Sequence, residues 1–486
     1  MSRDAQGEHA EHSRVSPEAI AALSRILPAQ SLLLTEEERR PYECDGLTAY
    51  HQLPELVLLP ENEAQVIATL KLCHRLKLPV VARGAGTGLS GGATPVAAGV
   101  VLSLAKFMTI LEVDPRLRTA RVQPGVRNLA ISEAAAPYGL YYAPDPSSQI
   151  ACTIGGNIAE NAGGVHCLKY GLTVHNVMRL RIATMAGEVL EIGGPALDAA
   201  GYDLLALLIG SEGMLAVVLE ATVKLTPKPQ LAQVVMASFA DVTQAGNAVA
   251  NIIGEGIIPA GLEMMDRQAT AAVEAFVHAG YDLSASAILL AESDGTPEEV
   301  GAEIAAMRAV LENSGATEVR VSRDEAERLK FWAGRKSAFP AVGRLTPDYM
   351  CMDGTIPRKH IAAMLSRIQG FAREFGLRCA NVFHAGDGNL HPLIMFDASV
   401  EGELERATAF GTRILELSVE MGGTITGEHG VGIEKVQQMC AQFTSEELAL
   451  FRAIKTAFDE FGLLNPGKVV PTPRRCSEYR LTGSAA

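Results

Sequence analysis

The chain has 486 residues, which is too long for one ordinary hydrophobic core and predicts two or more domains. Hydrophobic residues make up 48% and charged residues 20%, as in a typical globular enzyme. The net charge of −14 argues against nucleic acid as a partner, and it means that an anionic substrate needs a local cation or metal.

The eight cysteines form no CxxC or CxxCH motif, so an iron–sulfur cluster or c-type haem in this chain is not expected, and dispersed thiols suit a reducing compartment. The N-terminal sequence MSRDAQGEHAEHSR has no apolar core and carries acids, unlike a secretory signal or a transit peptide. No run of 18 apolar residues is present, so no transmembrane segment is predicted. We therefore expect a cytoplasmic protein, with peripheral attachment to the inner face of the membrane left open.

The first half of the chain begins with short polar helices over 16–40 and continues as a β–α–β pattern. A strand at 56–59 is followed by a helix at 62–76, which Asn62 can cap, and by a strand at 79–82. Further strands are predicted in a glycine-rich region at 100–104, 119–122, 179–184 and 216–224. Two prolines in the run TPKPQ indicate a domain boundary near residue 228.

The second half alternates helices and strands, which predicts an α+β domain whose antiparallel sheet is covered by helices. The predicted helices are 242–254, 266–279, 297–313, 358–375, 402–421 and 445–461, and the predicted strands are 231–238, 285–291, 317–321, 349–353, 380–384 and 390–396. We expect an N-terminal helical segment (1–50), a first domain (51–228), a second domain (229–444) and a C-terminal segment (445–486).

The glycine-rich loop 83–92 follows a strand directly, and its backbone N–H groups could hold a phosphate. Gly86, Gly88 and Gly91 satisfy GxGxxG, but Pro95 and a β-like run follow where a Rossmann site needs a helix. The loop backbone alone would then bind the phosphate, and a purely structural turn is the alternative. A second polar, glycine-rich region over 144–164 favours a ligand with two ends, such as a dinucleotide.

Residues 54–92, 144–171 and 210–213 resemble the flavin domain of the vanillyl-alcohol oxidase/p-cresol methylhydroxylase family. The resemblance implies FAD between two α+β subdomains, with 83–92 around the pyrophosphate and 144–164 running toward the isoalloxazine. Some members attach the flavin covalently through a histidine; His166 lies in the right region, but a non-covalent role is favoured. The implied FAD-binding residues are Arg83, Gly84, Ala85, Gly86, Thr87, Gly88, Ser90, Gly91, Gly92, Pro144, Asp145, Ser147, Ser148, Thr153, Gly155, Gly156, Asn157, Asn161, Gly163, Glu212 and Gly213.

The segment HAGDGNLH contains two histidines on either side of Asp387-Gly388, a strong two-residue turn signal. If these residues form the turn, His384 faces His391 across a hairpin with Cβ atoms about 5 Å apart, close enough to share a metal ion. A longer loop would alter the pairing but could keep both rings on one side. Two unrelated histidines remain the alternative.

The run Thr424–Gly432 supplies further candidate ligands, because glycines bracket its Glu428-His429 pair. Two histidines and a glutamate form a catalytic metal set, for which zinc fits best and Mn²⁺ or Fe²⁺ also fit. A solvated acidic loop is the alternative.

The motifs HAGDGNLHP, GEHGVG and NPGKV resemble the FAD-linked D-2-hydroxy acid dehydrogenases, over about residues 20–471. The resemblance implies that His384, His391 and Glu428 bind the metal, that His429 is the base and that Asn465 lies near the flavin, reached by a returning C-terminal segment. It also places an arginine in FWAGRK, so we assign Arg335 to the substrate carboxylate, with Lys336 second; a surface arginine is the alternative.

These assignments predict oxidation of a small 2-hydroxy acid: the metal binds the hydroxyl, His429 accepts its proton, and hydride passes to flavin N5. Relatives acting on 2-hydroxyglutarate carry Asn where this chain has Leu393, which favours glycolate or D-lactate. The resemblance further implies an iron–sulfur partner subunit or a quinone as electron acceptor, and a homo-oligomer is also open. A non-redox metal hydrolase and a flavin subunit with only structural duties are the rival hypotheses.

Overall fold

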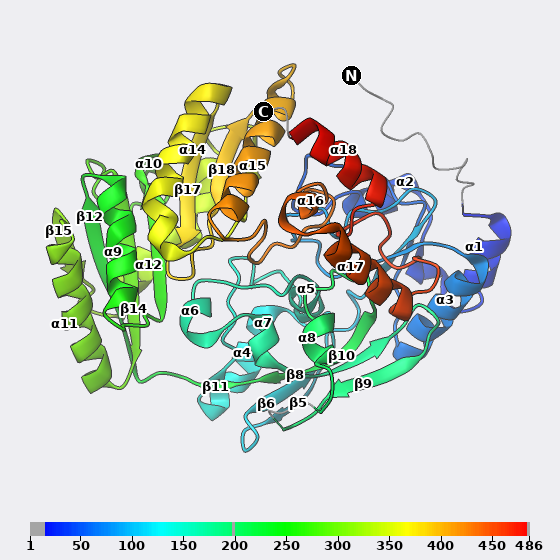
Figure 1. Ribbon diagram of the computed structural model, residues 1–486. Coiled ribbons are helices and arrows are strands. Elements are labelled where there is room, and N and C mark those ends of the chain that lie inside the picture. The colour runs from blue at the N-terminus through cyan, green and yellow to red at the C-terminus, as the bar shows by residue number, and fades with distance from the viewer. Residues whose placement is uncertain (1–14, 197–199, 484–486) are drawn as a thin grey trace.

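The computed structural model describes residues 15–196 and 200–483, and it divides into a larger region and a cap built around a separate sheet (Figure 1). The α+β class predicted from the sequence pattern is confirmed. Within the described ranges, no helix is both long and apolar enough to span a membrane.

The first subdomain is built around a four-stranded sheet with the order β1-β2-β4-β3. Its strands are β1 (Leu32–Leu33), β2 (Leu56–Leu58), β3 (Val80–Arg83) and β4 (Val100–Ser103), of which the last three are parallel. The crossover helix α3 (Glu63–Leu76) begins at Asn62, whose side chain accepts a hydrogen bond from Gln65 N as predicted. Helix α1 (Pro17–Leu23) packs into the same core through Ala19 and Leu23, so residues 17–33 are part of this subdomain, and the short helix α2 (Glu36–Arg39) follows β1.

The second subdomain is a five-stranded antiparallel sheet with the order β5-β6-β10-β8-β9. Its strands are β5 (Ile110–Asp114), β6 (Thr119–Val122), β8 (Val177–Ala183), β9 (Val189–Gly193) and β10 (Val217–Lys224). The helices of this part are α4 (Asn128–Ala135), α5 (Ile154–Glu160), α6 (Cys167–Tyr170), α7 (Thr173–Asn176) and α8 (Leu204–Leu208), and a short pair, β7 (Leu140–Tyr141) and β11 (Thr226–Pro227), precedes the cap.

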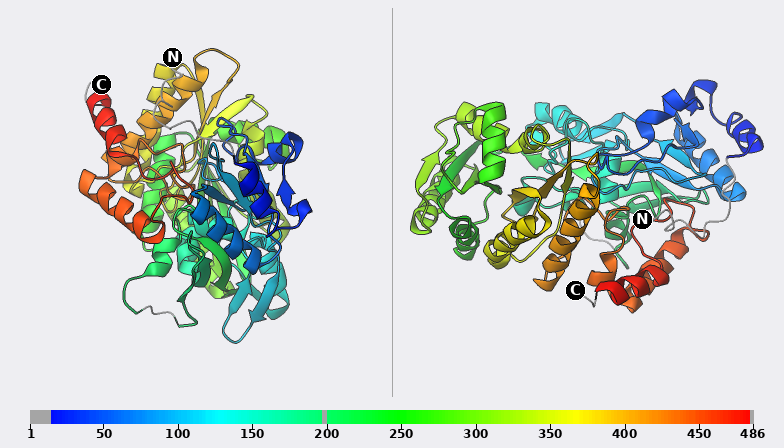
Figure 2. Two further views of the ribbon diagram at one scale, coloured as in Figure 1. Left: turned by 90° about the vertical axis from the view of Figure 1, so that its right-hand side faces the viewer. Right: turned by 90° about the horizontal axis from the view of Figure 1, so that it is seen from above.

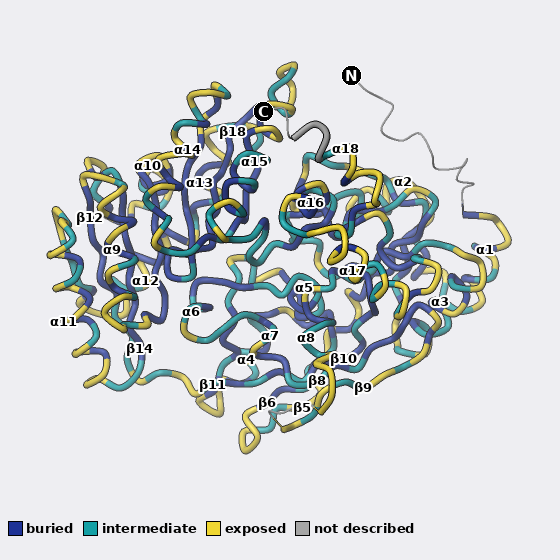
Figure 3. Tube along the Cα trace, viewed as in Figure 1, coloured by how far each residue is buried: buried dark blue, intermediate teal, exposed yellow. Residues whose placement is uncertain are grey.

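The cap is a seven-stranded antiparallel sheet with the order β15-β12-β14-β13-β17-β18-β16. Its strands are β12 (Leu231–Phe239), β13 (Gly261–Asp266), β14 (Ala287–Gly295), β15 (Glu318–Val321), β16 (Asp348–Cys351), β17 (Arg378–His384) and β18 (Pro392–Phe396). Alternate residues of β12 belong to different cores: Val235 and Ala237 pack with one layer of helices, Val234 and Met236 with the other. Figure 3 shows the central strands of this sheet buried and the outer faces of the helices exposed, while edge strand β15 is exposed or half-buried.

Two helix layers cover the two faces of the cap sheet. One layer contains α9 (Val242–Gly254), α11 (Pro297–Asn313), α14 (Ile361–Phe375) and α15 (Glu403–Glu420), and the other contains α10 (Arg267–Val277), α12 (Glu325–Lys336) and α13 (Ala338–Val342). Strand β13 was not predicted, because Glu263 and Asp266 interrupt the apolar pattern of its sequence. In the fold both carboxylates are nevertheless buried.

The C-terminal segment continues from the cap through α16 (Met439–Gln442) and α17 (Ser445–Phe458) and reaches the first subdomain at Leu463 and Leu464 (Figure 2). The last helix, α18 (Pro473–Gly483), follows this contact and packs with α16 against the cap core. Leu464 forms a parallel bridge with Val80, and Asn465 N donates to Val80 O at 2.8 Å. Cys440 and Cys476, which were expected to be free thiols, form a disulfide that joins α16 to α18.

Candidate active site

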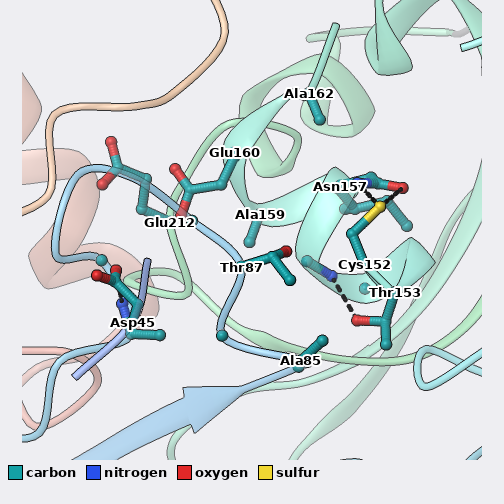
Figure 4. A pocket seen from close by; sticks show the side chains of 18 of the residues that line it. Asp45, Ala85, Thr87, Cys152, Thr153, Asn157, Ala159, Glu160, Ala162 and Glu212 are labelled. Atoms are coloured by element: carbon teal, nitrogen blue, oxygen red, sulfur yellow. Dashed lines mark hydrogen bonds between the residues drawn. The ribbon is translucent and has the colours of Figure 1, made fainter. Parts of the chain in front are cut away.

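A cavity of about 390 Å³ lies where the two subdomains meet the cap (Figure 4). Most of the predicted FAD-binding residues line it: Arg83, Gly84, Ala85, Gly86, Thr87, Gly88, Gly92, Ser147, Ser148, Thr153, Gly155, Gly156, Asn157, Glu212 and Gly213. The two glycine-rich regions, far apart in sequence, therefore face one space. A dinucleotide would be held there largely by main chain.

Helix α5 supplies the N-terminus that the first glycine loop lacks. Thr153 caps this helix by accepting a hydrogen bond from Gly156 N, and Gly155 and Gly156 at its first turn line the cavity. A Cβ on Gly84 would lie 2.4 Å from Thr153 Oγ1, so only glycine allows the loop to approach the helix so closely. The N–H groups of Ile154 and Gly155 in the first turn of α5 donate to Val126 O and Pro124 O, so the main chain of the first loop is the place that favours a phosphate.

Several predicted residues support the cavity without lining it. Asn465 Nδ2 donates to Gly92 O at 3.0 Å and Glu212 O at 2.7 Å, so it holds two cavity segments from behind. Asn161 ends helix α5, and its Oδ1 accepts from Val174 N. Ser90 and Gly91 contact the 430s loop, and Pro144 O accepts from Asn128 Nδ2.

Three carboxyl groups line the end of the cavity that the two subdomains form, which we call the flavin end: Asp45, Glu160 and Glu212 (Figure 4). Of these, only Glu212 was predicted from the sequence. Burial, and then the negative charge of Glu212, raise the pKa of Glu160 well above its usual value, which favours its neutral form. Glu212 accepts hydrogen bonds from Val431 N and Gly432 N, both at 2.7 Å. A flavin-domain carboxylate thus holds the loop that carries Glu428 and His429.

At the cap end, His384, His391 and Glu428 converge as potential metal ligands. Glu428 Oε1 lies 3.1 Å from His384 Nε2 and 3.3 Å from His391 Nε2. Both ring nitrogens of His391 are buried without a hydrogen bond in the described part of the chain, as expected for a side chain that completes a metal site. A Cβ on Gly163 would lie 2.4 Å from Glu428 Oε2, so this glycine makes room for the carboxylate.

The predicted hairpin register is wrong, although the predicted proximity of the rings holds. His384 faces Asn389 rather than His391, and β17 pairs Asn381 with Pro392. The turn is longer because Gly388 N donates to His384 O, while Gly386 N donates to Leu262 O of β13. The register moves by an even number of residues, so His391 keeps its face and the ring centroids lie 5.1 Å apart.

Glu263, on the missed strand β13, orients His384. Its Oε1 lies 2.6 Å from His384 Nδ1, which leaves Nε2 pointing at Glu428. A carboxylate on the second nitrogen is the usual support of a metal-binding histidine. Burial disfavours charge on His384, but Glu263 and Glu428 outweigh it and raise its pKa.

Arg335 is not positioned as predicted for bidentate capture of a substrate, because its Nε donates to Glu263 Oε2 at 2.7 Å and its side chain is 1% exposed. Its Nη2 is buried without a partner among the described residues. Lys336, the second choice, lines the cavity beside Phe339 and Pro340, two apolar residues that the sequence analysis did not identify. Leu393 is buried in the cap core and does not line the cavity, so it gives no direct support for a small substrate.

Asp353 fixes the loop that carries the predicted base. Its carboxylate accepts hydrogen bonds from Gly427 N at 3.0 Å, Glu428 N at 3.2 Å and His429 N at 2.9 Å. The His429 ring stacks on His391 with centroids 4.8 Å apart. Burial lowers the pKa of His429 to about 4, although Asp353 opposes this, so the imidazole is neutral at pH 7 and can accept a proton.

His166 has no free nitrogen for a covalent flavin bond. Its Nδ1 lies 2.8 Å from Asp145 Oδ2 and its Nε2 lies 3.1 Å from Glu292 Oε1. Neither His166 nor Asp145 lines the cavity. This arrangement favours the non-covalent alternative.

Family models match both halves of the chain: an FAD binding domain over residues 54–193 and the C-terminal domain of FAD linked oxidases over residues 228–469. The glycolate oxidase subunit GlcD of Escherichia coli strain K12 is 60% identical over 95% of this chain and 92% of that protein. A D-lactate dehydrogenase of Anaerostipes hadrus is 32% identical over 94% and 98%.

Solved structures share the fold. The 4-ethylphenol oxidase from Gulosibacter chungangensis superposes with a TM-score of 0.80 at 16% identity, covering 96% of this chain and 99% of that chain. A p-cresol methylhydroxylase gives 0.76 at 16% identity, covering 93% and 96%. The expected p-cresol methylhydroxylase-type architecture is therefore confirmed.

Proposed function

Because the chain belongs to the family of FAD-linked oxidases, we propose that this FAD-linked oxidoreductase converts a small 2-hydroxy acid, glycolate first, to the 2-oxo acid. The proposal rests on one observation above all: His391 and Glu428 of the His384–His391–Glu428 cluster line the same cavity as His429 and the glycine-rich loops. The relatives named for glycolate and D-lactate oxidation support this substrate class.

The residues of the cavity fit FAD, which when bound supplies the acceptor for two electrons and a hydrogen. Main-chain N–H groups of the first loop would hold its phosphates. The neutral form of Glu160 avoids placing another negative charge beside them.

His384, His391 and Glu428 fit a divalent metal, for which the N,N,O donor set suits zinc and does not exclude manganese or iron. When bound there, such an ion would supply Lewis acidity toward the substrate oxygens. Glu263 keeps the Nε2 lone pair of His384 directed at the ion, and Asp353 keeps Glu428 in place.

His429 would accept the proton of the substrate hydroxyl. Its neutral ring lies at the cavity wall, stacked on a candidate ligand, and its Nδ1 is buried without a partner among the described residues. Lys336, which lines the same cavity, would meet the substrate carboxylate, while Arg335 stays buried and paired with Glu263. Phe339 and Pro340 add an apolar surface to the cavity beside Lys336, and this surface would suit the short carbon chain of a two- or three-carbon acid.

The electrons would leave through a second protein subunit or a quinone. One relative is named as a subunit of an oxidase, which supports a partner for this chain. An iron–sulfur subunit is the partner we propose, since the cysteines that the structure describes offer no cluster site of their own.

The test is turnover of a panel of 2-hydroxy acids by the purified chain with an artificial dye acceptor, before and after removal of metal by a chelator. We expect flavin absorption bands, activity highest with glycolate, and loss of activity on chelation. A colourless, fully loaded protein, or one that turns over none of the acids, would contradict the proposal. Faster turnover of D-lactate than of glycolate would favour the alternative substrate.

A further inference from the structure

One charged cluster outside the cavity joins the flavin domain to the cap (Figure 1, between α6 and α12). It is centred on His166, at the start of α6, which the proposed chemistry does not use. The imidazole lies between Asp145 of the flavin domain and Glu292 of cap strand β14. His166 N also donates to Asp145 Oδ1 at 3.2 Å.

Glu292 continues the cluster into helix α12. Its Oε2 accepts a hydrogen bond from Arg328 Nη1 at 2.7 Å and another from Trp332 Nε1. Arg328, Trp332 and Arg335 follow at helical spacing, so they share one face of α12. The last turn of this helix carries Lys336, the cation assigned to the substrate carboxylate, next to the buried Arg335.

The other end of the cluster reaches the flavin loop. Asp145 immediately precedes Pro146, Ser147 and Ser148, all of which line the cavity. A continuous series of ion pairs and hydrogen bonds therefore runs from the cavity loop through His166 to the helix that carries this cation. Lys169, in the same segment, also reaches β14, but through Asp294, which makes no contact with α12 among the described hydrogen bonds.

We propose that His166 is a positioning residue: it fixes α12 against the flavin loop, so that Lys336 meets the carboxylate of a substrate lying over the flavin. This inference rests on the proposed function, because it assumes that the substrate is a 2-hydroxy acid held by that cation.

The charge of His166 supports this role. Burial disfavours the imidazolium, but Asp145 and then Glu292 outweigh it and raise the pKa of His166 to about 10. The side chain of Glu292 is only 2% exposed and that of Asp145 13%. Without the imidazolium, Asp145 and Glu292 would lose the cation that they share across the domain boundary, and Glu292 would keep Arg328 as its one ion-pair partner among the described residues, which favours separation of the two segments.

The experiment compares His166→Gln with the wild-type holoenzyme in steady-state glycolate oxidation with the dye acceptor. Glutamine keeps the size and one hydrogen bond but loses the charge. We expect KM for glycolate to rise about tenfold with kcat changed less than about twofold, because substrate capture is weakened and the chemistry is not. FAD content, read from the flavin bands, should stay unchanged.

Two further variants separate positioning from general stabilisation. His166→Arg restores a cation with several donors and should recover a KM within about threefold of wild type. Lys169→Met removes a neighbouring ion pair of the same interface and should leave KM unchanged. If His166→Gln does not fold, Asp145→Asn breaks the same series from its other end and should raise KM in the same way.

The proposal would be overturned by an unchanged KM in His166→Gln, or by equal effects of His166→Gln and Lys169→Met. Failure of His166→Arg to recover the KM would also contradict it. A wild-type holoenzyme that oxidises no 2-hydroxy acid would instead refute the proposed function and this inference with it, so the two failures are distinguishable.

Discussion

The flavin end and the cap end of the cavity are built from different chemical groups. At the flavin end the wall is mainly the main chain of two glycine-rich segments, and at the cap end it consists of ionisable side chains held by buried carboxylates. A wall of main chain should be sensitive to added bulk and tolerant of changes in side-chain chemistry. A wall of side chains should show the opposite behaviour.

The sharpest test of the cap end is His384→Ala. Loss of a metal ligand should remove several kcal/mol of Lewis-acid stabilisation, roughly 10³-fold in kcat/KM. Bound metal, measured by elemental analysis, should fall in parallel, while FAD stays bound. His51→Ala, at an exposed histidine, is the matched control. Full activity and metal content in His384→Ala would mean that the histidine cluster is not the metal site.

Glu263→Gln tests whether the buried carboxylate that orients His384 contributes to metal affinity almost as much as a ligand does. It removes the anion that orients His384 and pairs with Arg335, so metal affinity should fall about 10–100-fold. The measurement is competition with a graded chelator. Glu318→Gln, on exposed edge strand β15, serves as the control. Unchanged affinity would show that His384 is oriented by other contacts.

Gly84→Ala tests the main-chain wall. The added Cβ would meet Thr153 Oγ1 at 2.4 Å, and the overpacking should weaken FAD binding about tenfold. The FAD content after dialysis and its recovery with excess FAD give the readout. Gly194→Ala, where a Cβ would meet nothing within 4 Å, is the matched control. Retention of FAD equal to the control would contradict the proposed close approach.

The smallest effect is expected for Ser147→Ala, which changes side-chain chemistry at the flavin end without adding bulk. Ser147 is exposed at the cavity edge, so the FAD dissociation constant should change by less than about twofold. A change of more than about tenfold would show that hydroxyl groups, and not main chain alone, hold the cofactor.

The helices and strands that could be predicted from the sequence are those with a clear pattern of apolar and polar residues. Helix 242–254 has the predicted bounds, and the strand at 119–122 does as well, because their apolar periodicity is undisturbed. Strand β13 was missed because its carboxylates break the pattern. Both carboxylates have structural partners: Glu263 orients His384 in the site, and Asp266 caps helix α10 and accepts a hydrogen bond from Asn381. At a position such as Glu263, the polar side chain that the site needs replaces the apolar side chain that the strand pattern calls for, as is common at functional sites.

The candidate site shows the same limit. Motifs identified the histidines, Glu428 and the two loops, because these residue types are rare at such spacings. The hairpin register could not be read locally, since Gly386 N bonds to Leu262 O on a strand far away in sequence. Asp353 and Glu160 were also missed: nothing near them in sequence signals a role, and only the fold brings them to the loop 427–430.

The contact of Glu212 with Val431 N and Gly432 N has a consequence for how FAD and the proposed metal would bind. The carboxylate belongs to the flavin wall, and the amides belong to the loop that presents Glu428. Ordering of either segment by its ligand lowers the free energy needed to order the other. Binding should then be cooperative, and thermodynamic linkage requires that FAD tighten the metal by the same factor as the metal tightens FAD.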